Sequence, residues 1–462
     1  MIDAVAKRSA QSAGMVASAT KGRDLMGGTA AMRSAAKTYL PIMPAESEEG
    51  YQARLSQSWL FNAYANTVGS MTGKVFSVPV EPGDETPPAM VEWLANADLQ
   101  GRDLSTFARA VFEDGVSGSG ISYIMVDAPV RSGVVTQSEA YSQGLRPYMV
   151  HLRVDDILGW KTTVIANVTV LSQVRIMEKL CEPSPTDEFT DVEIEQIRVL
   201  DRMEKGVQVR LYRKGRDKNW TLYDEPRLTG LDEITIVPFY ANRTGFFTGA
   251  PMLDDLADVN IAHWQSQSDQ RNILHVARVP LLFGAGFAEQ DKLVISSQTA
   301  TLSSNENASL AWVEISGASI AAGRQDLKDI EFQMETFGLQ LTTARPGAQS
   351  ATGEALDADK ETSTLSMTAD ALKDCLEQAL IWMAEYGGLG EIMPDVAVNK
   401  DYGVNLMGAQ DMLAMLAAVN TGAVSRETFL REMARRGMVR ADLDPLDEAE
   451  RIALEGGAGG GQ

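Results

Sequence analysis

Three histidines are the first residues that could bind a metal or transfer a proton: His151, His263 and His275. His263 and His275 fall in one predicted helix, but they are twelve residues apart, too far for two metal ligands on adjacent turns. Packing or surface roles are the stronger interpretation for all three. The two cysteines, Cys181 and Cys375, lie far apart, so we expect free thiols in a reducing compartment and no disulfide framework or cysteine-rich metal site.

Carboxylates gather at two places where paired acids could do acid–base chemistry. The clusters are Asp254, Asp255 and Asp258, and Asp357, Asp359 and Glu361. Both lie near the predicted N-termini of helices, where the helix dipole alone favours acidic residues. A structural role is therefore the favoured interpretation of both clusters.

Sequence motifs of common enzymes are missing. The chain has no GxxxxGKS/T phosphate loop and no HExxH, CxxC or GxSxG motif. The glycines of GVSGSGIS (residues 115–122) do not match GxGxxG, and a predicted strand follows them, so this run indicates a turn. We therefore predict a protein that is not an enzyme, with no catalytic, metal-binding or cofactor-binding residues.

The elements of the first half alternate between helix and strand. Ser47 is placed to cap a helix that runs toward Gly69, and residues 74–80 read as a short strand. Helical spacing returns in DLSTFARAVFEDGVSGSG, and ISYIMVDAP reads as a buried strand. From about residue 147 to 240, short runs of alternating apolar and polar residues predict a sheet with one solvent-exposed face.

At Pro251 the period becomes helical and continues to Pro280. The apolar stripe of this predicted helix is thin: Leu253, Leu256, Ala257, Ile261 and Trp264. We expect a helix of this kind to pack beside copies of itself rather than in a conventional core.

Short strands are predicted between residues 280 and 320, and further helices follow. One carries Leu327, Ile330, Met334, Phe337 and Leu341 on one face. A very long helix from about Glu354 to Tyr386 has its face set by Leu365, Ala369, Leu372, Leu376, Leu380 and Met383. Two helices around DMLAMLAAV and SRETFLREMARRG precede a glycine-rich tail that we expect to be disordered.

The formal net charge of −22 is unevenly distributed. Residues 1–45 hold six basic and two acidic residues, a net charge of +4, which leaves −26 for the remainder. A basic segment on an acidic body indicates either an arm that touches a neighbour or nucleic acid, or a solvated surface with a loose start. The sequence has no run of 18 or more apolar residues and no apolar core of a signal peptide, so we expect neither a membrane span nor secretion.

Five stretches stand in a characteristic order: YLPIMPAESEEGYQARLSQSWLFNAYANTVGSMTGKVF, DLSTFARAVFEDGVSGSGISYIMVDAP, RPYMVHLRVDDILGWK, IVPFYANRTGFFTGAPMLDDLADVNIAHWQSQSDQRNILHVARVPLLFGAG and SATGEALDADKETSTLSMTADALKDCLEQALIWMA. Their succession resembles the portal proteins of tailed bacteriophages, in particular the subgroup with the uncharacterised domain DUF4055. The stretches cover most of residues 38–390, and none is specific by itself.

The resemblance implies an α+β portal fold with an α/β wing, a two-helix stem, a small β-containing clip, a long helix and a helical crown. The implied ranges are a basic arm at 1–45, the wing at 46–250, stem helices at 251–278 and 323–344, the clip at 279–322, a tunnel loop at 345–353, the long helix at 354–390, the crown at 391–440 and an acidic tail at 441–462.

The same resemblance implies a homo-oligomeric ring, usually dodecameric, at one capsid vertex of the virion, assembled in the host cytoplasm. Double-stranded DNA would pass through it without sequence-specific contacts during packaging, retention and ejection. The implied protein partners are the large terminase, a head–tail adaptor, and the major capsid and scaffolding proteins. An acidic channel wall would lower friction, because each phosphate contact would otherwise add to binding.

Two sets of residues would face the channel. The tunnel loop would present Arg345, Pro346, Gly347, Gln349, Ser350, Thr352 and Gly353 to DNA, although a plain flexible connector is the alternative. The stem would present Asp254, Asp258, Trp264, Gln265 and Arg271.

Two other functions stay open at this stage. One is a different virion structural protein, such as a head–tail adaptor or a capsid-associated scaffold. The other is a soluble α+β oligomeric enzyme, which would need a cleft with convergent titratable groups.

Overall fold

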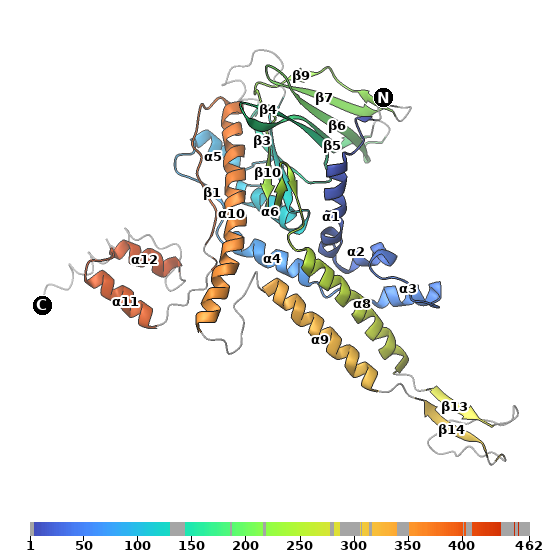
Figure 1. Cartoon of the computed structure of the whole chain (residues 1–462). Helices are drawn as coiled ribbons and strands as arrows, with labels where there is room; N and C mark the ends of the chain where they lie inside the picture. Colours follow the sequence, from blue (N-terminus) through green and yellow to red (C-terminus); the bar gives the residue numbers. More distant parts are fainter. Residues whose placement is uncertain are drawn as a thin grey trace. The chain divides into compact units, whose positions relative to one another are not determined.

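The computed structural model divides the chain into two compact units, Met1–Lys400 and Asp401–Gln462. It describes residues 4–129, 144–184, 187–215, 219–277, 281–286, 305, 307–313, 317–339, 351–400, 402, 409–435, 448 and 451. Helices and antiparallel sheets are mixed in the first unit, so the predicted α+β class is confirmed (Figure 1).

The N-terminal segment is part of the first unit and not a separate arm. Helix α1 (Ala10–Met26) buries Met15, Ala19 and Leu25, and α2 (Gly28–Ala35) follows directly. Arg8 fixes the start of the segment, because its guanidinium donates to carbonyl oxygens of the loop and strand at residues 154–157. Small residues dominate α1, so its packed face has almost no apolar periodicity in the sequence.

The helix expected from Ser47 toward Gly69 is two helices, α3 (Glu48–Gln57) and α4 (Ala63–Val75). Ser47 does cap α3, with its hydroxyl accepting from Gly50 N at 3.1 Å. Asn62 caps α4 by accepting from Ala65 N at 3.0 Å, and this second cap explains the break. The strand expected at 74–80 is wrong, because α4 runs through Val75.

A three-stranded antiparallel sheet with the order β10–β2–β3 forms the middle of the first unit. Its strands are β10 (Ile236–Tyr240), β2 (Ile121–Asp127) and β3 (Tyr148–Leu152). Helix α6 (Leu104–Ser117) and the long helix α10 (Ala351–Gly387) pack against it (Figure 1). All six residues predicted for the face of α10 are buried, which confirms that pattern. The short α5 (Pro88–Leu94) precedes α6.

The β-rich stretch is a separate antiparallel sheet with the order β4–β5–β6–β7–β8, with β9 paired to β7. The strands are β4 (Ile157–Ile165), β5 (Val168–Pro183), β6 (Asp191–Arg202), β7 (Val207–Lys214), β8 (Trp220–Leu222) and β9 (Arg227–Leu228). One face joins the main apolar core. The other face holds a small apolar cluster around Ile197 and Trp220, against which Val5 and Ala6 pack. This face is therefore less exposed to solvent than we expected.

Two long helices and a small hairpin follow. They are α8 (Asp254–Ala277), β13 (Leu281–Ala285), β14 (Ser309–Val313) and α9 (Gly317–Leu339). Minor pairs are β11 (Arg243–Gly245) with β12 (Thr248–Gly249), and β1 (Glu81–Pro82) with β15 (Val396–Ala397).

In the second unit, α11 (Ala409–Asn420) and α12 (Arg426–Arg435) contact each other. Ser425 caps α12, with its hydroxyl accepting from Thr428 N at 3.0 Å. Both helices lie where the sequence predicts them. Most of the glycine-rich tail lies outside the described residues.

Candidate functional site

Helices α8 and α9 pack side by side and run in opposite directions (Figure 1). Three side-chain contacts along the pair show the direction, since the residue number rises on one helix as it falls on the other. From the hairpin end they are Gln270 Nε2 to Ile320 O at 3.0 Å, Ser266 Oγ to Asp326 Oδ2 at 2.6 Å, and His263 Nε2 to Glu331 Oε1 at 3.3 Å.

Gly323 allows the two helices to approach closely. A Cβ atom at this position would lie 2.1 Å from Gln270 Oε1, well inside van der Waals contact. The Gln270 side chain is itself buried and holds the carbonyl of Ile320. The contact between α8 and α9 therefore depends on a residue without a side chain.

The expectation that α8 does not lie in a core is wrong, because part of the helix is buried within its own chain. Trp264, His263 and Asn260 are each at most 1% exposed within a single chain. Asn260 Oδ1 accepts from Tyr64 N at 3.0 Å and its Nδ2 donates to Phe61 O at 2.8 Å. Phe61, before α4, and Tyr64, in its first turn, thus satisfy the buried amide of Asn260, which lets this polar position of α8 be buried.

The five predicted stem residues lie in different surroundings. Trp264 is fully buried, so a place on a channel wall is excluded for it. Gln265 is half-buried and donates from Nε2 to Tyr39 O at 2.8 Å. Arg271 is exposed, as are Asp254 and Asp258.

The two aspartates at the start of α8 are paired with α1. Lys21 Nζ lies 2.9 Å from Asp254 Oδ1 and 2.5 Å from Asp258 Oδ1. Partial burial opposes the charge on Lys21, but the hydrogen bonds to Asp258 and Asp254 prevail and raise its pKa above the usual value. These carboxylates therefore tie the N-terminal helix to α8 and are not free acids.

The predicted tunnel loop lies mostly outside the described residues, which include none of Arg345, Pro346, Gly347, Gln349 and Ser350. Thr352 and Gly353 belong to the first turn of α10, since that helix begins at Ala351 and not near residue 354. The second acidic cluster consequently lies beyond the first turn of α10, at residues 357–361.

The sequence reading missed a set of exposed apolar side chains on the α8–hairpin–α9 segment. They are Phe332 (63% exposed), Phe283 (58%), Phe337 (40%) and Ile273 (38%). Phe332 stands apart from the predicted apolar face of its helix, which is the signal that could have revealed it. Phe337 is on that face and is exposed nonetheless.

The described residues include one grouping of catalytic residue types. His151 Nε2 lies 2.8 Å from Ser122 Oγ and 3.3 Å from Asp114 Oδ2. A Ser-His-Asp triad needs the serine and the carboxylate on different ring nitrogens, whereas both share Nε2 here. Ser122 is also fully buried, so the grouping has the features of core packing.

The described residues contain no group of three His, Cys, Asp or Glu side chains able to hold a metal ion. None of the helices in this part of the chain combines the length and apolarity needed to cross a membrane.

Residues 251–387 match the model of a domain of unknown function, DUF4055. The matched region includes α8, β13, β14, α9 and α10, and it confirms the DUF4055 part of the resemblance for these residues. No curated protein matches the sequence.

Two solved structures are similar to the chain. One, described as the virion of a native gene transfer agent particle, has 11% identity and a TM-score of 0.37, covering 81% of this chain and 89% of that one. The other, described as the neck of the native particle computed with C12 symmetry, has 12% identity and a TM-score of 0.38, covering 79% and 88%. Likeness at this level does not establish a shared function.

Proposed function

We propose that this chain is the portal subunit of a tailed bacteriophage and forms a ring-shaped channel for DNA at one capsid vertex. The observation that carries the proposal is the segment α8–β13–β14–α9, two long antiparallel helices joined by a small antiparallel hairpin. Its order and position along the chain match the stem and clip that the sequence resemblance implies. The DUF4055 match over the same residues supports it.

The exposed apolar side chains of this segment favour an oligomer. Phe332 and Phe283 are more than half exposed in the single chain, where they gain nothing from burial. A ring built from heterologous contacts would cover such side chains with the next subunit, and it would do so at every interface.

The finer assignments are part of the same proposal. The segment 279–322 would receive the large terminase and later the head–tail adaptor, and residues 345–353 would contact DNA. The wing would meet the capsid and scaffolding proteins. Duplex DNA would pass without sequence-specific contacts, and the net charge of −22 would weaken any binding to its phosphates.

Particle mass tests the proposal against the alternatives. Twelve copies of the 50.1 kDa chain would have a mass of about 600 kDa. Native mass spectrometry of the purified protein should show a ring of roughly this size. A monomer, a dimer or a hexamer would instead favour an adaptor, a scaffold or a soluble enzyme.

A pair of variants tests the surface that carries the proposal. Phe332→Glu should break the ring into smaller species while circular dichroism stays unchanged, because it places a charge at the subunit contact. Phe189→Glu is the matched control, since Phe189 is 90% exposed in the connection between β5 and β6. Intact rings with Phe332→Glu would show that the exposed side chain of Phe332 does not lie at a contact between subunits.

A further inference from the structure

A cavity of about 310 Å³ lies between α1, α6 and the loop that joins β3 to β4. Its polar lining residues are Arg23, Glu113, Asp114, Ser117, Ser119, Arg153 and Asp155. The volume is at the lower end of the range for small-molecule sites. The cavity belongs to neither the helix pair nor the predicted tunnel loop, so it is independent of the proposed function.

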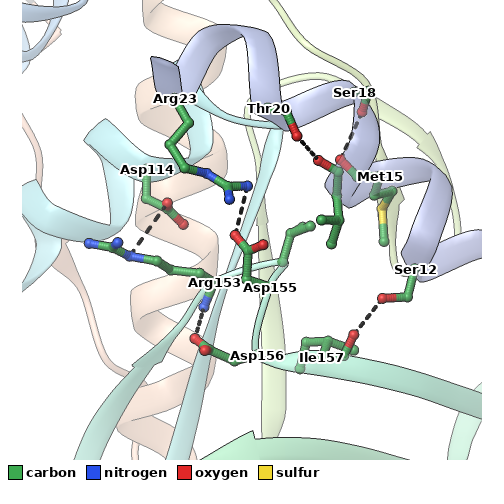
Figure 2. A network of polar contacts seen from close by, with 12 residues as sticks. Ser12, Met15, Ser18, Thr20, Arg23, Asp114, Arg153, Asp155, Asp156 and Ile157 are labelled. Carbon is green, nitrogen blue, oxygen red and sulfur yellow. Dashed lines mark hydrogen bonds and ion pairs between the residues drawn. The ribbon is translucent and has the colours of Figure 1, made fainter. Parts of the chain in front are cut away.

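Both arginines at the cavity are already engaged by aspartates (Figure 2). Arg23 Nη2 lies 2.8 Å from Asp155 Oδ2, and Arg153 Nε lies 3.8 Å from Asp114 Oδ1. The second oxygen of Asp114 is 3.3 Å from His151 Nε2. Each arginine therefore has a carboxylate partner, and the three carboxylates of the lining, Glu113, Asp114 and Asp155, outnumber the two guanidinium groups.

Two side chains of the lining, Glu113 and Ser119, have hydrogen-bond acceptors without a partner among the described residues. No ion pair or hydrogen bond involves the Glu113 carboxylate among the described residues. Ser119 is only 1% exposed, and its hydroxyl has no hydrogen-bond partner in the same part of the chain. Burying a hydroxyl without a hydrogen-bond partner costs free energy. The Ser119 hydroxyl therefore indicates that a ligand in the cavity supplies its partner.

Further carboxylates make the charge near the cavity more negative. Asp156 follows the lining residue Asp155 in the sequence and accepts from Arg153 N at 2.8 Å (Figure 2). Burial raises the pKa of Asp156 above its usual value, and the charges of Asp114 and Asp155 raise it further. A cation beside these carboxylates would relieve the repulsion between them.

We infer that this cavity binds a primary ammonium group on a short aliphatic stem. The ammonium has three donors and no acceptor, which matches Glu113 and Ser119 and leaves the paired aspartates undisturbed. Ala19, Met26 and Ala110 provide an apolar wall for the stem. The described residues offer no three-ligand metal site, so a small inorganic cation suits the cavity less well.

Such a group has two sources, a free alkylamine or a lysine side chain of another copy of the chain. The first arm of the test titrates the full-length protein with 1,4-diaminobutane in a calorimeter, with 1,4-butanediol as the uncharged control. We expect saturable binding of one diamine per chain and none of the diol. Glu113→Gln should weaken binding by about tenfold or more, the effect of losing a charge-assisted hydrogen bond.

Matched variants separate this site from general attraction to an acidic protein. Glu204→Gln removes the same charge from an exposed turn and should leave the affinity unchanged. Ala110→Leu keeps every charge but fills the cavity, and it should abolish binding. Thermal unfolding of each variant confirms that the fold is intact.

The second arm mixes isotope-labelled and unlabelled protein and treats the assembly with a carbodiimide, which joins lysines to adjacent carboxylates. A cross-link from Glu113 to a lysine of another copy, lost in Ala110→Leu, would assign the cavity to a contact between subunits. Diamine binding that Glu113→Gln weakens would assign it to a free amine. Absence of both results, or diamine binding equal in Glu113→Gln and Glu204→Gln, would overturn the inference.

Discussion

At the residue scale, His263 shows how α8 accommodates polar groups. Its imidazole is 1% exposed, Nε2 lies 3.3 Å from Glu331 Oε1, and Nδ1 has no partner among the described residues. Burial lowers the pKa of His263 below the usual 6.5, and the hydrogen bond to Glu331 offsets only part of this effect. The ring is therefore neutral at neutral pH.

This lowered pKa predicts an acid-sensitive helix pair. As the pH falls below about 6.5, the unfolded chain takes up the proton before the folded chain does, so stability is lost with decreasing pH. We expect the Tm to fall between about pH 7.5 and 5.5, and His263→Gln to flatten that dependence. His275→Gln, at an exposed position of the same helix, should keep the wild-type slope. Equal slopes in the wild type and His263→Gln would contradict this account.

The sequence predicts the burial of some side chains of α8 correctly and that of others wrongly. For His263 the sequence favours a packing or a surface role, and the structure buries the side chain. Trp264 was predicted to face a channel and is equally buried. Asn260 on the same helix is buried as well, because Phe61 and Tyr64, which are distant in the sequence, supply the partners of its amide group. No local pattern reveals such partners.

At the element scale, the close approach of α8 and α9 at Gly323 is the feature most open to test. Gly323→Ala should displace the Gln270 amide and destabilise the protein by about 1–3 kcal/mol, the usual cost of overpacking. Gly73→Ala is the control, because Gly73 lies in α4 with nothing within 4 Å, and it should be neutral or stabilising by up to about 1 kcal/mol. Chemical unfolding measures both. An equal response of the two variants would show that the helices are not in tight contact.

Long periodic elements were predicted best. The buried face of α10 follows from the spacing of Leu365 through Met383, and α8 lies between Pro251 and Pro280 as expected. Short connections were predicted worst. The break between α3 and α4 depends on the Asn62 cap, and α1 packs through small residues such as Gly22, where a Cβ would be 2.3 Å from Ser117 O.

At the scale of the whole molecule, we expect no nucleotide hydrolysis by the purified protein. The reason is that the sequence has no phosphate loop that could hold a nucleoside triphosphate. A phosphate-release assay on the intact oligomer should give the rate of the buffer alone. A rate that disappears with a single substitution in this chain would refute the prediction.

We propose that copies of this chain close into a ring around a channel. Electron microscopy of the purified full-length protein measures this most directly, through two-dimensional class averages of particles seen end-on. We predict rings with a central hole of roughly 20 Å or more, wide enough to admit duplex DNA. Compact particles without a hole, or open filaments of the same chain, would contradict the claim.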